Sequence, residues 1–152
     1  MSASLSNDML ELLAELEHHS VRFMIIGGHA VNYYTDPRAT KDLDIWINPT
    51  QENAKNVFQA LLAFGAPVTT ASPADFCDGK SFFIIGVKPN RVDILQNVPG
   101  LEFESAWQNC QKVQIGKLVV RVPGLNDLLK AKITAGRPQD LADVEKLKKV
   151  KL

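Results

Sequence analysis

The sequence has few cysteines, no excess of charge of either sign and no long hydrophobic run. Its two cysteines, Cys77 and Cys110, are too few and too irregularly spaced for a disulfide scaffold or a zinc site. Lysine and arginine number 17, as do aspartate and glutamate, so the formal net charge is zero. Proteins that coat nucleic acid non-specifically are strongly basic, so the charge balance argues against that role.

The sequence also lacks targeting signals, repeats and low-complexity tracts. It begins with MSASLSNDML, without the basic and then apolar stretch of a signal peptide, and no apolar run approaches the ~20 residues of a membrane span. The 152 residues, 45% hydrophobic and 22% charged, have the composition of a globular protein. We therefore expect one cytoplasmic domain over residues 1–152, with no membrane contact.

The periodicity of apolar residues predicts both helices and strands. Helices are expected at about residues 7–19, 29–34, 50–64, 125–135 and 139–150. Strands are expected at residues 21–26, 43–47, 81–87 and 91–95, and as a pair around Gly116 within 111–122. This order predicts an α+β fold with a mixed β-sheet, helices packed against it and two C-terminal helices.

A glycine pair, Gly27-Gly28, lies between a predicted buried strand and a predicted helix start. Without β-carbons the backbone can approach a ligand closely, and the free N–H groups of a helix N-terminus suit a phosphate. The alternative is an ordinary tight turn, and the pair by itself does not separate the two.

Asp42 and Asp44 alternate at the start of a predicted strand, so their side chains project to the same face. Carboxylates ~7 Å apart on one face repel each other unless a cation neutralises them. The alternative interpretation is a solvated strand edge. Arg38 and Thr40 continue the same alternation and are candidates for orienting the site or its substrate.

Asp93 lies within RVDIL (91–95), an otherwise apolar strand, where a carboxylate needs a partner. A metal ion shared with Asp42 and Asp44 would supply one, and ligands that are oxygen only favour Mg²⁺ or Mn²⁺ over zinc. The alternative is an acid on an edge strand that pairs with Arg91 or Lys41.

Together these motifs, Ile26-Gly27-Gly28, then DLDI (42–45) and VDI (92–94), resemble the signature of the DNA-polymerase-β-like nucleotidyltransferase superfamily. The segments RATKDLDI and LLKAKITAGRPQDLADVEKL resemble the small bacterial nucleotidyltransferases related to abortive-infection toxins. The resemblance covers roughly residues 20–147, which is nearly the whole chain.

The resemblance implies a nucleotidyl transfer assisted by two Mg²⁺ ions, with Asp42, Asp44 and Asp93 as metal ligands. It further implies that Asp93 takes the proton of the attacking hydroxyl and that Gly27 and Gly28 hold the triphosphate. Lys132 stands at the position of a helix lysine that faces the triphosphate, although a solvated lysine is equally consistent with the sequence.

Four other polar residues receive different interpretations. His29 is interpreted as a cap or packing residue, and Asp143 as part of a structural network. For Arg137 and Asp140 the sequence does not decide between structure and function.

The predicted function is therefore transfer of a nucleoside monophosphate from an NTP to an acceptor hydroxyl on RNA, a protein or a small molecule. Residues 117–152 hold nine basic and four acidic residues, a net charge of +5, which permits contact with a tRNA end. A toxin held inactive by an antitoxin protein is a further hypothesis. The alternative is a non-catalytic nucleotide-binding or regulatory module on the same fold.

Overall fold

The computed structural model describes residues 5–86 and 90–150, and it has the predicted α+β architecture. The helices are α1 (Asn7–His18), α2 (Gly27–Tyr34), α3 (Gln51–Phe64), α4 (Phe103–Gln108), α5 (Leu125–Ala135) and α6 (Pro138–Leu147), with a 3-10 turn η2 (Pro73–Phe76). The strands are β1 (Phe23–Ile26), β2 (Leu43–Ile47), β3 (Phe83–Ile85), β4 (Val92–Leu95), β5 (Gln111–Ile115) and β6 (Leu118–Val122).

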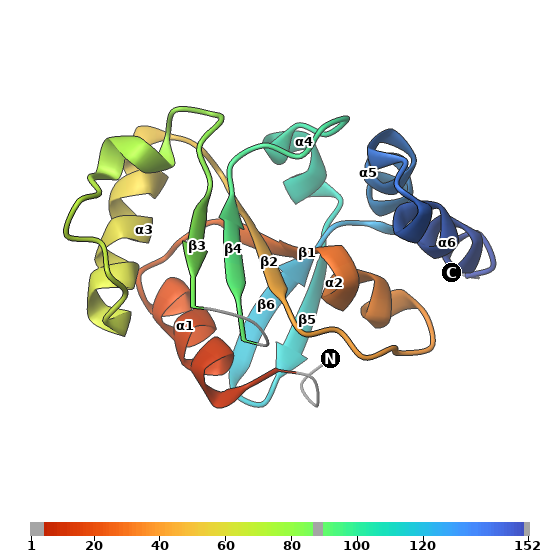
Figure 1. Ribbon diagram of the computed structural model, residues 1–152, viewed down its shortest axis with the longest axis horizontal. Coiled ribbons are helices and arrows are strands. Elements are labelled where there is room, and N and C mark those ends of the chain that lie inside the picture. Colours follow the sequence, from red (N-terminus) through yellow and green to blue (C-terminus); the bar gives the residue numbers. More distant parts are fainter. Residues whose placement is uncertain (1–4, 87–89, 151–152) are drawn as a thin grey trace.

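A four-stranded mixed sheet of order β1-β2-β4-β3 forms the centre of the molecule (Figure 1). Strands β2 and β4 are parallel, whereas β1 and β3 pair antiparallel to their neighbours. The remaining two strands form the hairpin β5-β6, and β6 lies against β1. The helix pair α5–α6 lies at one end of the molecule and contacts α2, while α1 and α3 lie at the other end (Figure 1).

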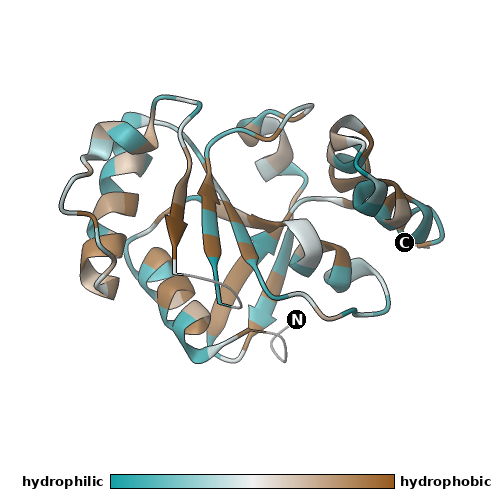
Figure 2. Cartoon of the chain, in the orientation of Figure 1, coloured by the Kyte–Doolittle hydropathy of each residue, from teal (hydrophilic) through white to brown (hydrophobic). Residues whose placement is uncertain are grey.

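The apolar stripe of α1 explains how the first helix packs. Its buried side chains are Met9, Leu12, Leu13 and Leu16, and the helix lies against α3. Each such side chain contributes ~1.5–3 kcal/mol when it is removed from water. Figure 2 shows the hydrophobic and hydrophilic residues that alternate along both helices.

Several element boundaries follow local signals in the sequence. Thr50 accepts a hydrogen bond from the Asn53 N–H at 3.2 Å and begins α3, as predicted. Gly65, at φ 92°, ends the same helix in the left-handed conformation. Strand β2 and helix α5 have the predicted bounds, and the strand pair around Gly116 is confirmed.

Two elements were not predicted, and one helix begins earlier than expected. Helix α4 was missed because it has only six residues and is stabilised by tertiary contacts, including Phe103 against the Trp46 ring at 5.1 Å. The 3-10 turn η2 lies in a segment without apolar period. Helix α2 begins at Gly27 and not after the glycines. Residues 87–89 of the predicted hairpin lie outside the described residues.

Within the residues that the structure describes, no helix is both long enough and apolar enough to cross a membrane.

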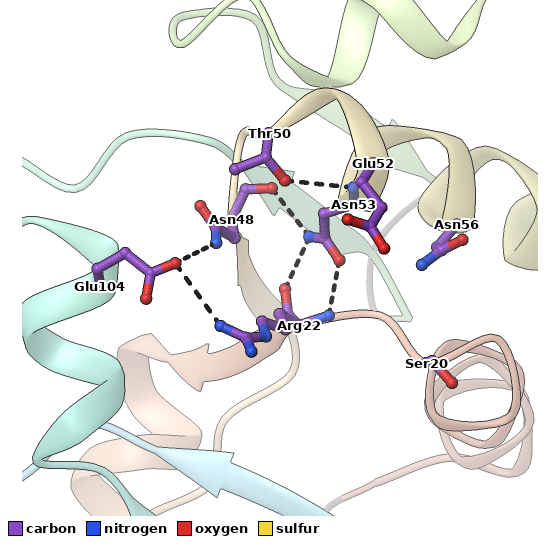
Figure 3. A pocket seen from close by; sticks show the side chains of 8 residues that line it. All are labelled: Ser20, Arg22, Asn48, Thr50, Glu52, Asn53, Asn56 and Glu104. Carbon is purple, nitrogen blue, oxygen red and sulfur yellow. Dashed lines mark hydrogen bonds and ion pairs between the residues drawn. The ribbon is translucent and has the colours of Figure 1, made fainter.

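A buried asparagine joins α3 to the central strands. The Asn53 amide accepts from the Arg22 N–H at 2.8 Å and donates to the carbonyls of Arg22 at 3.0 Å and Asn48 at 2.8 Å (Figure 3). Arg22 and Asn48 flank β1 and β2 at the end of the sheet away from Asp44. One side chain therefore satisfies three backbone groups at a junction of three elements.

We expect Asn53→Ala to lower the free energy of unfolding by about 2–4 kcal/mol, because it leaves buried backbone groups without partners. The matched control is Asn56→Ala, one turn further along α3, which removes no hydrogen bond that the structure shows and should cost less than ~0.5 kcal/mol. Urea unfolding followed by circular dichroism measures both. Equal losses would show that the Asn53 hydrogen bonds contribute nothing specific.

Candidate active site

The parallel pairing of β2 and β4 brings the predicted acids together. Asp44 and Asp93 are opposite each other in the register of the two strands, and Asp42 directly precedes β2. Residues two apart along a strand project to the same face, so Asp42 lies on the side of Asp44. The structure therefore gathers the three carboxylates at one end of the sheet.

The carboxylate of Asp44 lies in an environment that disfavours its charge. Burial raises its pKa from 3.8 to about 6, and the negative charges of Asp93 and Asp42 add to this shift. Asp44 is half-buried on β2, an inner strand of the sheet, so the interpretation as a solvated strand edge is wrong for this residue. The positive charges of Lys132 and Arg91 lower the pKa of Asp44, but by less than burial and the two acids raise it.

Arg91 is the cation nearest to the other two acids. Its Nη2 donates to Asp93 Oδ2 at 3.1 Å, and its Nε lies 2.9 Å from Asp93 Oδ1. The same Nη2 lies 3.9 Å from Asp42 Oδ2. The pairing of Asp93 with Arg91, which the sequence left open beside a metal, is therefore present.

The donors fit a hard divalent cation by their chemistry. All three are carboxylates, and Asp42 Oδ1 is buried without a hydrogen-bond partner. However, among residues 5–86 and 90–150 no three acidic, histidine or cysteine side chains are arranged to hold an ion. Asp93 Oδ1 is likewise buried without a hydrogen-bond partner in this part of the chain, although Arg91 Nε lies 2.9 Å from it, so a metal ion beside this carboxylate would lie next to the guanidinium charge.

The glycine pair lies directly against the acids. Gly27 has φ +70°, and a β-carbon there would come within 2.4 Å of Asp44 Oδ2. A β-carbon at Gly28 would come within 2.6 Å of Thr40 Oγ1. A β-carbon at either position would force the facing side chain to shift. Helix α2 begins there with Ile26 as its N-cap, whose side chain makes no capping hydrogen bond. The first N–H groups of α2 are therefore free of a side-chain cap beside Asp44.

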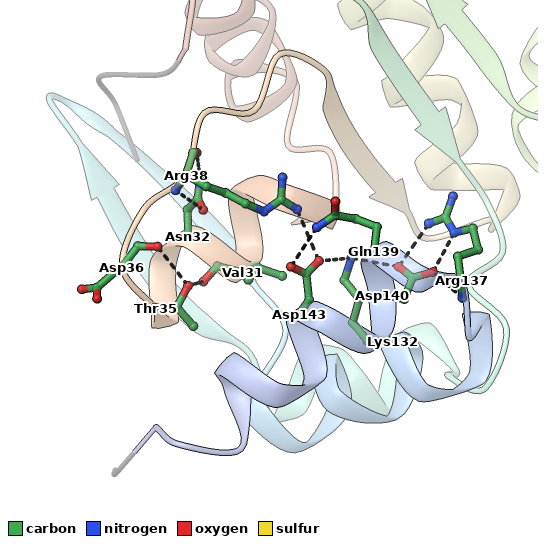
Figure 4. Close-up of polar contacts among 10 residues, drawn as sticks. All are labelled: Val31, Asn32, Thr35, Asp36, Arg38, Lys132, Arg137, Gln139, Asp140 and Asp143. Carbon is green, nitrogen blue, oxygen red and sulfur yellow. Dashed lines mark hydrogen bonds and ion pairs between the residues drawn. The ribbon is translucent and has the colours of Figure 1, made fainter.

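Lys132 is buried in an ionic network between α5 and α6. Its Nζ lies 3.2 Å from Asp140 Oδ1 and 3.1 Å from Asp143 Oδ2. Arg137 Nε lies 2.6 Å from Asp140 Oδ2, and Arg38 Nη2 lies 3.3 Å from Asp143 Oδ2 (Figure 4). The solvated alternative for Lys132 is wrong, since only 8% of the residue is exposed. Asp143 belongs to a network, as predicted.

A pocket of about 180 Å³ lies between this network and Asp44, while Asp42 and Asp93 are outside its lining. Gly27, Asp44, Lys132, Arg137 and Asp140 supply its polar lining. Its apolar lining comes from the segment after β4 and from α5, and includes Leu95, Val98, Leu101, Leu128 and Ala131. Arg38 and Thr40 lie behind Gly28, outside the lining of this pocket.

Sequence reasoning missed the apolar side of the pocket. Residues 95–101 carry no recognisable motif, and they line the pocket only because they follow β4 beside Asp93. His29 is fully buried with no partner for either ring nitrogen among the described residues, and burial lowers its pKa to about 4. A neutral buried ring agrees with its interpretation as a packing residue.

A second, polar pocket of about 340 Å³ lies around Arg22, Asn48 and Glu104 (Figure 3). It is at the opposite end of β2 from Asp44. Its central side chains bind one another, for example Asn48 Nδ2 to Glu104 Oε1 at 2.8 Å, so they leave little polar capacity for a ligand.

Three solved structures have the same overall fold at low sequence identity. The lincosamide antibiotic adenylyltransferase LnuA, in its lincomycin-bound crystal structure, has a TM-score of 0.62 at 17% identity and covers 97% of this chain and 99% of its own. The antibiotic-resistance factor ANT(2'')-Ia has a TM-score of 0.60 at 15% identity, covering 97% and 83%. An antigenic nucleotidyltransferase-like protein from Paracoccidioides brasiliensis has a TM-score of 0.53 at 18% identity, covering 94% and 77%.

No curated protein matches the sequence significantly. The structural likenesses, at 15–18% identity, show the fold alone. They agree with the predicted membership of the DNA-polymerase-β-like nucleotidyltransferase superfamily. A protein family described as "Nucleotidyl transferase of unknown function (DUF2204)" matches residues 5–152. The chain therefore belongs to this nucleotidyl transferase family.

Proposed function

We propose that the protein transfers a nucleoside monophosphate from an NTP to an acceptor hydroxyl in a reaction that depends on Mg²⁺ or Mn²⁺. The observation that carries this proposal is the position of Asp44, which lies beside Asp93 and against the Gly27 backbone in one pocket. In the reaction the acceptor oxygen forms a bond to the α-phosphorus while the bond to pyrophosphate breaks. The hydroxyl proton leaves to a base.

Asp42, Asp44 and Asp93 are the residues that would hold the metal ions, which supply positive charge to the attacking and leaving oxygens. Asp93 lies on β4 beside Asp44, where a carboxylate can accept the acceptor proton. This role requires that Asp93 be free of Arg91.

The start of helix α2 and Lys132 are suited to the polyphosphate. Gly27 and Gly28 present backbone N–H groups next to the carboxylates, and no β-carbon keeps a phosphate at a distance. Lys132 lines the same pocket, and its charge is shared with Asp140 and Asp143 until a phosphate competes for it. Arg38 and Thr40 support the glycine turn from behind, which suits a role in orienting the site.

For the acceptor we infer a small molecule. The pocket beside Asp44 is smaller than the ~300–1,000 Å³ of most ligand sites, so it accommodates one ring or side group and not a folded chain. The zero net charge argues against a long contact with nucleic acid. Two proteins of the same fold are a lincosamide adenylyltransferase and an antibiotic-resistance factor, which favours the same class.

The cytoplasmic location and the toxin role with an antitoxin partner stay predictions. A non-catalytic nucleotide-binding module remains the second candidate, favoured by the pairing of Arg91 with Asp93. Calorimetry with Mg-ATP and a non-hydrolysable analogue separates the two. A module binds NTP equally well after Asp42→Ala, whereas a metal-dependent enzyme loses affinity.

We expect label from α-³²P NTPs to pass to a small hydroxyl compound in the presence of Mg²⁺, and Asp93→Asn to slow the transfer at least ~10²-fold by removing the base. The panel should contain a lincosamide, an aminoglycoside, total tRNA and the protein itself. Asp36→Asn, an exposed acid outside the site, is the control and should keep full activity. Label on tRNA or protein alone would contradict the acceptor class, and no label on any acceptor would contradict catalysis.

The variants Gly27→Ala and Gly116→Ala separate the effect of backbone strain from the effect of a β-carbon that lies against Asp44. Gly27→Ala and Gly116→Ala each place a side chain at positive φ, +70° and +60°, and each should lose about 1 kcal/mol of stability. Only Gly27→Ala also pushes a β-carbon into Asp44, because nothing lies within 4 Å at Gly116. We expect NTP binding measured by calorimetry to fall at least ~10-fold for Gly27→Ala alone. Equal binding by both variants would remove Gly27 from the site.

Replacement of Asp44 should stabilise the metal-free protein while it abolishes transfer. Because the folded-state pKa is raised from 3.8 to about 6, ionisation of Asp44 costs stability progressively as pH rises through this window. Asp44→Asn removes this cost, so in EDTA at pH 7.5 its Tm should exceed that of the wild type by roughly 3 °C. The difference should shrink as pH falls from 6 to 4. A lower Tm at pH 7.5 would show that the Asp44 charge is already compensated.

A further inference from the structure

We propose that Arg91 is an internal counterion that competes with the divalent metal for Asp93 and Asp42. In the metal-free protein its guanidinium holds both carboxylates, and metal binding displaces it. This inference rests on the proposed function, because it concerns the metal of that reaction. It assigns to Arg91 a control of metal affinity that is separate from the chemistry of transfer.

The contacts set the two cations in competition at Asp93. Arg91 Nη2 donates to one oxygen of this carboxylate at 3.1 Å, and Nε lies 2.9 Å from the other, which is buried and accepts no hydrogen bond among the described residues. A metal ion at ligand distance from either oxygen would lie against the positive charge of the guanidinium. Nη2 also reaches Asp42 Oδ2 at 3.9 Å, so one guanidinium spans two predicted metal ligands.

The backbone fixes Arg91 at this place, while its side chain can leave. Its carbonyl accepts a hydrogen bond from the Leu43 N–H at 3.0 Å, which joins the residue to the start of β2. The side chain is 33% exposed, so the guanidinium can rotate into solvent without opening the core. Displacement therefore needs new side-chain torsions and no change in the sheet.

One guanidinium does not balance the charge of the cluster. Arg91 contacts Asp42 and Asp93, but it has no contact with Asp44. Lys132, the lysine that lines the pocket with Asp44, is held by Asp140 and Asp143. Arg91 is the cation that pairs with the cluster within 4 Å, while Lys132 and Arg137 act on Asp44 from further away. The remaining negative charge attracts a divalent ion. The position of the guanidinium against the Asp93 oxygens, and not the charge total, is what makes the two cations compete.

The test measures metal binding in the absence of nucleotide. Mn²⁺ is titrated into the full-length wild type, Arg91→Gln and Arg91→Lys, and free Mn²⁺ is followed by electron paramagnetic resonance. We expect Arg91→Gln to bind Mn²⁺ about tenfold more tightly, because no charge-assisted pair has to be broken first. Arg91→Lys keeps the positive charge but lacks the planar guanidinium, so its Mn²⁺ affinity should lie between those of the wild type and Arg91→Gln.

Arg22→Gln is the matched control. Arg22 lies 3.7 Å from the Glu104 carboxylate at the opposite end of β2, and its loss changes the net charge by the same amount. Its Mn²⁺ affinity should equal that of the wild type. A tightening as large as that of Arg91→Gln would attribute the effect to net charge and overturn the proposal.

Thermal unfolding gives a second readout that does not depend on activity. In EDTA, Arg91→Gln should have a lower Tm than the wild type, because Asp42 and Asp93 then repel each other without a counterion. At saturating Mn²⁺ this difference in Tm should disappear, since the variant that binds Mn²⁺ more tightly gains more stability from it. A difference in Tm that Mn²⁺ leaves unchanged would overturn the proposal.

The outcomes separate this inference from the proposed function. If the wild type binds Mn²⁺ and both Arg91 variants bind it equally or more weakly, Arg91 supports the site and the counterion role is wrong, while the enzyme proposal stands. If no variant binds Mn²⁺ with or without NTP, both proposals are wrong. Should Arg91→Gln not fold, the comparison of Arg91→Lys with the wild type decides.

Discussion

The parallel pairing of β2 with β4 is the constraint on which the rest of the site depends. It places Asp44 opposite Asp93 at one end of a sheet whose other residues there are apolar, such as Leu43 and Val92. Two carboxylates in partly buried surroundings are unfavourable, as the raised pKa of Asp44 shows. The neighbouring features, a guanidinium, a glycine turn and a buried lysine network, are all arranged around this concentration of negative charge.

The protein balances its negative charges in two separate groups of very different burial. Arg91, directly before β4, has a side chain that is one-third exposed and pairs with Asp93. Lys132 is buried and forms ion pairs with Asp140 and Asp143, whose side chains are 1% exposed. Breaking a buried pair leaves an uncompensated charge in the interior, so opening the Lys132 network costs more than opening the Arg91 pair.

The buried network also explains how the C-terminal helices keep their position. Helices α5 and α6 pack mainly against each other and α2, Ala131 of α5 also packs near Met24 and Trp46 of the sheet, and few of their apolar side chains are buried. Arg38, in the segment after α2, bonds Asp143 of α6, and that segment is folded back because Asn32 bonds the Arg38 backbone at 2.8 and 3.1 Å. Ionic contacts therefore hold the helix pair α5–α6, which carries Lys132, next to Gly27 and Gly28 at the start of α2.

The sequence predicted those parts of the fold that local patterns determine. The apolar run 43–47, the Thr50 cap and the Gly65 stop each depend on neighbouring residues, and each was right. The strand order and register depend on tertiary packing, and so do the six residues of α4. The three acids were found because carboxylates are unfavourable in apolar strands.

What the sequence left undecided was the choice among partners. Asp93 had Arg91 or Lys41 as candidates beside a metal, and only the geometry of β4 shows that the guanidinium reaches it. Lys132 pairs across a helix break with residues 8 and 11 positions later, a spacing that no single-helix pattern reveals. Long side chains have many reachable partners, and packing selects one.

The division between the sheet that carries the acids and the segments that line the rest of the pocket also bears on substrate selection. Asp42, Asp44 and Asp93 are held in place by the sheet. In the proposed function they take part in the transfer itself, so their replacement affects the transfer step and not the choice of acceptor. The pocket's other wall comes from residues 95–101 and from α5, where Val98 and Leu101 carry no charge and take no part in the sheet. Side chains there can change in size without disturbing the strand register. For the proposed transfer, we therefore place the selection of the acceptor at this apolar wall and not at the carboxylates.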